Sequence, residues 1–160
     1  MTPLVLLILM FGLPLFLVTV LRINPLFLFV SIVSGYLWSL LLGDTTELVV
    51  GSLIQTSHTD VISRVGLLMV PFVLTLLFLR KTLSTSALPF YFTLLVMDSL
   101  LLVTLLLPML TPGVQGAIYQ THLGDTLRQA HDLIIAGVAA MQLVVMYVFR
   151  PRSKHSKHHK

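Results

Sequence analysis

A single acidic side chain lies in the middle of one of the most apolar stretches of this sequence. Asp98 is embedded in FTLLVMDSLLLVTLLL. If this stretch spans a membrane, a carboxylate near its midpoint is energetically expensive, and the default interpretation is a role in a proton or ion path. Asp98 is therefore the first candidate for chemistry in the chain.

Other polar side chains fall at comparable depths in neighbouring apolar stretches. A protonated Asp98 could donate a hydrogen bond to the side-chain oxygen of Gln142, and hydroxyl groups could complete a polar layer between helices. The alternative is that Asp98 is a helix–helix hydrogen-bonding residue with structural value only, and the lack of a basic partner in its span favours this alternative. The predicted polar layer consists of Asp98, Gln142, Ser34, Ser31 and Thr75.

Histidine and aspartate form a second set of candidates in the two longest polar connections. These side chains are common zinc ligands, so the two connections together could hold a metal and support a membrane enzyme. Neither HExxH nor a comparable ligand spacing occurs, and the alternative is a pair of i,i+4 ion pairs, Asp60–Arg64 and Arg128–Asp132. We therefore expect no cofactor, and enzymatic activity is the less favoured hypothesis. The candidate metal ligands are His58, Asp60, His122, Asp125 and His131.

The C-terminal residues, RPRSKHSKHHK, are basic. Near a membrane such residues attract anionic lipid headgroups at roughly 1 kcal/mol per charge. The alternative is a disordered tail that only keeps the C-terminus on the cytoplasmic side. The candidate headgroup contacts are Arg150, Arg152, Lys154, Lys157 and Lys160.

The composition indicates that a lipid bilayer surrounds these residues. The chain has 160 residues, of which 56% are hydrophobic and only 10% charged. Soluble domains contain about 25% charged residues, and a small globule has too little interior to bury so much apolar surface. We predict one polytopic membrane domain over residues 1–150 and a tail over 151–160. The absence of cysteine excludes disulfides and thiolate metal sites, and the sequence contains no nucleic-acid-binding module.

Five apolar stretches approach the roughly 20 residues that a membrane-spanning helix requires. The sequence therefore predicts an all-α integral membrane protein with five spans, or four if the short third stretch is re-entrant. The expected spans are residues 4–21, 26–42, 65–79, 90–110 and 133–149.

The basic connections predict the orientation of these spans. Arg22, the pair Arg80-Lys81 and the tail all fall on one side if there are five spans. The positive-inside rule makes that side cytoplasmic and leaves the N-terminus outside, which suggests a bacterial inner membrane. The two outer connections, residues 43–64 and 111–132, have apolar residues at helical spacing and are expected to form amphipathic surface segments.

The two outer connections also resemble one another in sequence. At an offset of 65, four residue types coincide, which predicts a tandem helical-hairpin repeat, with convergence between similar hairpins as the alternative. The matching positions are Gly51, Gln55, Thr56 and Asp60 in the first connection and Gly116, Gln120, Thr121 and Asp125 in the second.

Three functional hypotheses follow. The first is a subunit, scaffold or accessory factor that forms homo- or hetero-oligomers in the membrane. The second is a minimal transporter or channel protomer that uses Asp98, and the third is a membrane enzyme with an outer-face His/Asp site. Helix packing is expected to use the small residues of the last span, which are Ala136, Gly137, Ala139 and Ala140.

Overall fold

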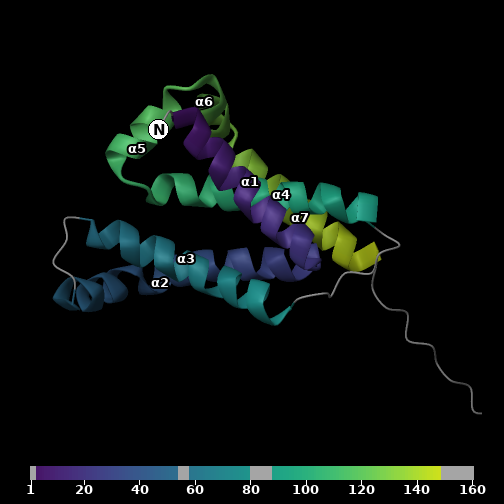
Figure 1. The fold of residues 1–160 in the computed structure, drawn as a ribbon, viewed down its shortest axis with the longest axis horizontal. Coiled ribbons are helices and arrows are strands. Elements are labelled where there is room, and N and C mark those ends of the chain that lie inside the picture. The colour runs from purple at the N-terminus through teal and green to yellow at the C-terminus, as the bar shows by residue number, and fades with distance from the viewer. Residues whose placement is uncertain (1–2, 54–57, 80–87, 149–160) are drawn as a thin grey trace, which may run out of the picture.

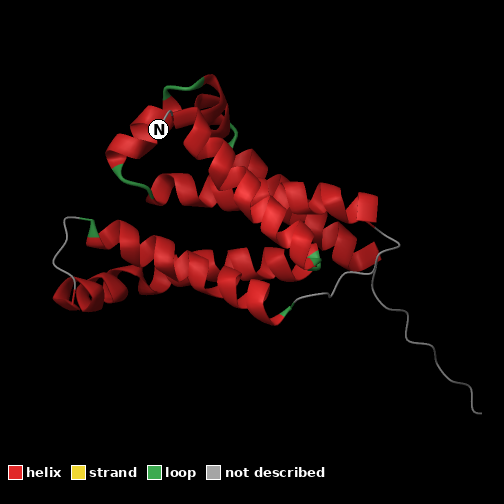
Figure 2. Ribbon diagram, viewed as in Figure 1, coloured by secondary structure: helices red, strands yellow, loops and turns green. Residues whose placement is uncertain are grey.

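The computed structural model is helical almost throughout the residues it describes, which are 3–53, 58–79 and 88–148 (Figure 2). Five of its helices are long and apolar enough to cross a membrane. This confirms the predicted all-α fold with five helices of membrane-spanning length and hydropathy. The elements are α1 (Pro3–Leu21), α2 (Pro25–Leu53), α3 (Thr59–Phe78), α4 (Leu88–Leu106), the 3-10 turn η2 (Leu107–Met109), α5 (Pro112–Tyr119), α6 (His122–Gln129) and α7 (His131–Val148).

A tight turn joins α1 to α2, as the sequence predicts. Arg22 adopts a left-handed conformation, with φ of 52°, and reverses the chain. The side-chain oxygen of Asn24 then accepts the backbone N–H of Leu26 at 3.1 Å. Pro25 is the first residue of α2. Proline lacks a backbone N–H, but an N–H at this position would have no partner within the helix. These residues therefore stop one helix and start the next within a few positions.

The α2–α3 hairpin is longer than predicted. α2 runs to Leu53 rather than ending near residue 42, and its 29 residues extend about 43 Å. No proline interrupts residues 43–53, so nothing in the sequence breaks the helix there. α3 begins at Thr59 rather than near residue 65, and its 20 residues are long enough for a complete span. The predicted surface helix in the first outer connection is therefore wrong, because its described residues continue the two spans.

The second outer connection forms two short helices, α5 and α6, at the end of the bundle where α1 begins (Figure 1). Thr121 starts α6 by accepting the backbone N–H of Gly124 on its hydroxyl at 3.1 Å. Gly124 lies directly against the carbonyl of Ile118, where a β-carbon would not fit. The two sequence-related connections thus differ in structure, and the tandem repeat stays a prediction.

The core of the bundle is centred on α4. The apolar segment Tyr91–Met109 covers most of α4 and the turn η2. Of its most apolar part 67% is buried, against 17% for α1 and for α7. α4 contacts α1, α2 and α7, whereas α3 packs chiefly along α2. Figure 1 shows the α2–α3 pair on one side and α4 with α7 on the other, with α1 running diagonally across α4 and α7 toward the start of α2 in this view. A polar residue on the inward face of α4 is therefore enclosed by other helices.

Three of the four small residues of α7 do not make the predicted helix contacts, and the fourth, Ala139, is half-buried. Ala136, Gly137 and Ala140 are exposed, and a β-carbon added to Gly137 would meet nothing within 4 Å. The close approach occurs instead between α2 and α3. Gly35 lies against the backbone carbonyl of Leu68, and the missing side chain lets the two helices come together there.

Candidate functional site

The structure brings Asp98 and Gln142 together in the interior of the bundle. The side-chain nitrogen Nε2 of Gln142, on α7, donates a hydrogen bond to Oδ1 of Asp98, on α4, at 2.8 Å. Both residues are 0% exposed. Gln142 shares one face of α7 with Val138 and Val145, at the i, i+4, i+7 spacing that turns a helical stripe toward a neighbour. The hydrogen bond runs from the amide to the carboxylate, opposite to the direction expected from the sequence.

Several polar atoms around this hydrogen bond have no partner in the described part of the chain. They are Oδ2 of Asp98, Oε1 of Gln142 and the hydroxyl oxygen of Ser99, the next residue along α4. A buried polar group without a hydrogen bond costs about 1–3 kcal/mol. The pair therefore holds α4 against α7 and keeps two oxygen acceptors in an apolar interior.

The remaining members of the predicted polar layer do not join this hydrogen bond. Ser31 of α2 is buried, and its hydroxyl has no partner among the described residues. Ser34, also on α2, and Thr75 of α3 are half-buried. The polar layer is therefore a single interhelical hydrogen bond with unconnected hydroxyl groups elsewhere in the bundle.

Sequence reasoning missed four buried hydroxyl residues. Ser99 and Ser63 have unpaired hydroxyls, Thr104 donates to the carbonyl of Leu100 at 2.8 Å, and Ser39 contacts the sulfur of Met109 at 3.8 Å. Helical periodicity does not identify Ser63, because it lies five residues before the stripe of buried residues on α3 and therefore off that face. That stripe is Leu68, Phe72 and Leu76.

The predicted metal ligands lie on separate elements. His58 and Asp60 are at the start of α3, His122 and Asp125 are on α6, and His131 begins α7. Within residues 3–53, 58–79 and 88–148, no three His, Cys, Asp or Glu side chains are grouped so that they could hold a metal ion. The metal-dependent enzyme hypothesis therefore has no assembled ligand set in this part of the chain.

The ion pairs that were the alternative to metal binding are also different from those predicted. Arg64 contacts Asp44 of α2 at 3.0 Å instead of Asp60. Arg128 lies over the ring of Tyr119, 5.5 Å from its centroid, instead of pairing with Asp132. Partners from other helices replace the local i,i+4 pairs because the packing of α3 on α2 and of α6 on α5 brings them closer.

No protein family, characterised protein or solved structure matches this chain. What the chain does must therefore be inferred from its own geometry. The predicted headgroup contacts of the tail fall outside the described residues. They are Arg150, Arg152, Lys154, Lys157 and Lys160.

Proposed function

We propose that this chain acts by association, as a subunit, scaffold or accessory factor of a membrane complex. The observation that carries this proposal is the fully buried hydrogen bond between Asp98 and Gln142. The most unusual side chain of the membrane domain uses one of its oxygens to hold α7 against the central helix α4. Such hydrogen bonds contribute about 0.6 kcal/mol on average and up to about 1.7 kcal/mol in membrane proteins. This is the behaviour expected of a structural polar contact.

The surface of α7 supports the same proposal. The helix buries only Val138, Gln142 and Val145, so most of its circumference is free to contact lipid or another protein. Small side chains allow close helix approach in membranes, and Ala136, Gly137 and Ala140 of α7 lie on this free surface. We propose that a second copy of the chain or a partner protein contacts α7 there. Exposed apolar residues on that surface include Leu133, Leu143, Val144 and Tyr147.

The chain is also proposed to lie in a bacterial inner membrane with its N-terminus outside and its C-terminus in the cytoplasm. The positive charges of the Arg22 turn, of Arg80-Lys81 and of the tail support this orientation, because basic connections are retained on the cytoplasmic side.

The first experiment is purification in a mild detergent, with measurement of mass and identification of bound proteins. A stable homo- or hetero-oligomer is expected. Because the chain contains no cysteine, single cysteines can then locate the interface by crosslinking. Ala140→Cys, on the exposed face of α7, should crosslink, whereas Val138→Cys, on the buried face, is the matched control. A monomer without partners, in detergent and in native-lipid nanodiscs, would contradict the proposal.

A transporter or channel protomer is the second candidate, and a specific observation favours it. Oδ2 of Asp98 and Oε1 of Gln142 are acceptors with no partner among the described residues, and a permeating proton or cation could use them. The Asp98→Asn substitution separates the two candidates. It preserves shape and hydrogen bonding, so it should leave assembly intact, but it should abolish proton or cation flux into dye-loaded proteoliposomes if the carboxylate carries the ion.

A further inference from the structure

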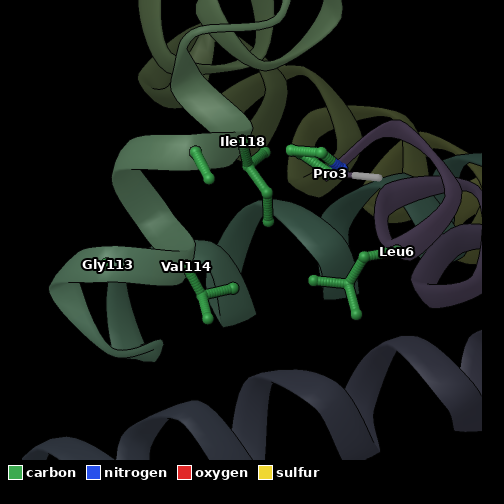
Figure 3. Close-up of a pocket in the computed structure, with 6 residues that line it drawn as sticks. Pro3, Leu6, Gly113, Val114 and Ile118 are labelled. Carbon is green, nitrogen blue, oxygen red and sulfur yellow. The ribbon is translucent and has the colours of Figure 1, made fainter. Parts of the chain in front are cut away.

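Two apolar cavities border the N-terminal half of α1, at the end of the bundle that holds α5 and α6. In Figure 3, Val114 of α5 and Leu6 of α1 lie across the first cavity from one another, and Ile118 points into the space between them. The first cavity has a volume of about 270 Å³ and is lined by Pro3, Leu6, Gly113, Val114, Ala117 and Ile118. The second has a volume of about 220 Å³ and is lined by Leu7, Phe11, Leu100, Val103, Leu123, Thr126 and Leu127.

One small apolar cluster contributes lining residues to both cavities. It consists of Leu7, Val103, Leu107 and Ile118, which are all buried. Ile118 lines the first cavity, whereas Leu7 and Val103 line the second. Tyr119 packs against the same cluster from the end of α5. Both apolar cavities therefore border the same small core, and Tyr119 packs against that core.

A cation is held at the edge of this region. The guanidinium of Arg128 lies over the ring of Tyr119, 5.5 Å from its centroid, and the residue is exposed. It makes no ion pair within the described residues. The nearest carboxylates in sequence contact other partners, since Asp125 accepts from Gln129 at 2.8 Å and Asp132 contacts His131 at 2.9 Å. Arg128 therefore presents guanidinium N–H donors that are free to bind an anion.

We propose that this region binds one diacyl phospholipid, with an acyl chain in each cavity and the phosphate on Arg128. Arginine binds phosphate oxygens through paired N–H donors, and the Tyr119 ring holds the guanidinium in place. α5 has eight residues and is about 12 Å long, so the cavity at its start and the cation at its end are within the reach of one lipid. Bulk lipid contacts any exposed apolar face, but two concave apolar sites beside a fixed cation select a molecule with two tails and a phosphate.

The headgroup beyond the phosphate is not selected by these contacts. Asp125 and Asp132 lie close to Arg128 in the sequence, so the region is not a strongly basic patch. The recognised group is therefore the phosphodiester itself. This assignment does not depend on the assembly proposed for α7, because no residue that lines either cavity belongs to α7.

The test uses the purified full chain and native mass spectrometry, with dioleoylphosphatidylglycerol as the probe. Saturable binding of one lipid is expected. Arg128→Gln should weaken binding about tenfold, which corresponds to about 1.4 kcal/mol. Gly113→Leu should weaken it similarly, because Gly113 lines the first cavity and a β-carbon at this position meets no atom within 4 Å.

Matched controls are available for both variants. Gly116 is on the same helix, also meets nothing within 4 Å and does not line the cavity, so Gly116→Leu should bind lipid normally. Arg22 is exposed at the opposite end of the bundle, so Arg22→Gln should also bind normally. Circular dichroism of each variant shows whether its helices are retained.

Two further ligands separate the contributions of tail and phosphate. Dioleoylglycerol, which lacks the phosphate, should bind about as weakly as the phospholipid binds to Arg128→Gln, and glycerophosphoglycerol, which lacks the tails, should not bind measurably. Equal binding of dioleoylglycerol and the phospholipid would overturn the role of Arg128. Equal losses in the control variants, or binding that never saturates, would overturn the site.

Discussion

Gly35 of α2 lies against the backbone carbonyl of Leu68 of α3, so closely that a β-carbon on residue 35 would overlap the carbonyl oxygen. Because the obstacle is backbone rather than a flexible side chain, it cannot move aside without shifting α3. The contact lies midway along the α2–α3 hairpin and sets the separation of the two helices. Among the glycines of the long helices in the described residues, Gly35 lies closest to a neighbouring helix.

We expect Gly35→Ala to destabilise the hairpin by about 1–3 kcal/mol, the usual cost of overpacking an interior contact. Unfolding in mixed detergent micelles, followed by circular dichroism, measures this change. Gly66→Ala on α3 is the matched control, because a β-carbon there meets nothing within 4 Å. Since alanine is the better helix former, the control should be neutral or stabilising. Equal destabilisation by both substitutions would contradict the close contact.

Removing both partners of the Asp98–Gln142 hydrogen bond should cost less than the sum of the losses from removing each partner alone. Asp98→Ala leaves a buried amide without its acceptor, and Gln142→Ala leaves a buried carboxyl group without its donor. Each substitution should lower the free energy of unfolding by about 1–3 kcal/mol. The double-mutant cycle should give a coupling of about 0.6–1.7 kcal/mol. Additive effects would show that the two residues do not interact.

Ser99 provides the control for that cycle. Its hydroxyl is buried and has no hydrogen-bond partner in the described structure. Ser99→Ala removes an unsatisfied polar group without breaking a contact, so we expect the free energy of unfolding to be unchanged or slightly raised. A loss comparable to that of Asp98→Ala would indicate a partner for the hydroxyl.

The ion pair between Arg64 and Asp44 should be measurable but weak. Its side chains are 43% and 91% exposed, so a coupling of about 0.2–1 kcal/mol is expected, decreasing with added salt. A double-mutant cycle with Asp44→Asn and Arg64→Gln measures it. The same cycle with Asp60→Asn tests the local pair expected from sequence, and its coupling should be close to zero. The reverse ranking would contradict the packing of α3 against α2.

Single-cysteine labelling should show which connections share a side of the membrane. Ser52→Cys and His122→Cys are expected to react with an impermeant maleimide added outside intact cells. Arg22→Cys should react only after the cells are permeabilised. Different behaviour of Ser52→Cys and His122→Cys would contradict five spans, because five spans place the end of α2 and the start of α6 on the same side of the membrane.

A reporter fused after Lys160 gives the absolute orientation and should be active in the cytoplasm. Reversal of this result, together with all three cysteine results, would leave the fold intact and invert the proposed orientation.

Features that depend on local sequence were predictable. The turn at Arg22, the start of α2 at Pro25 and the existence of five apolar helices follow from nearby residues, because backbone preferences and hydropathy act over a few positions. The ends of α2 and α3 were not predictable in this way. Polar residues at positions 44–47 resemble a loop, yet packing of α2 against α3 maintains both helices beyond that point. Tertiary contacts commonly override local preference in this manner.

In the candidate site, too, some features were predictable from the sequence and others were not. Sequence alone identified Asp98 and Gln142, because a polar residue in an apolar helix is conspicuous without knowledge of its neighbours. It did not identify Gly35 as the close contact, and it assigned Arg64 and Arg128 to the wrong partners. Sequence spacing reports which residues share a face of one helix, but not which face of another helix lies opposite.

The sequence by itself determined that this is a helical chain with five stretches long and apolar enough to cross a membrane and a carboxylate among its apolar residues, since composition and periodicity are properties of the chain alone. The tertiary structure decided which helix is central, that the carboxylate bonds to Gln142, and that Arg128 lies beside two apolar cavities. Those features depend on which helix faces are brought together, and that is settled by packing between residues far apart in the sequence.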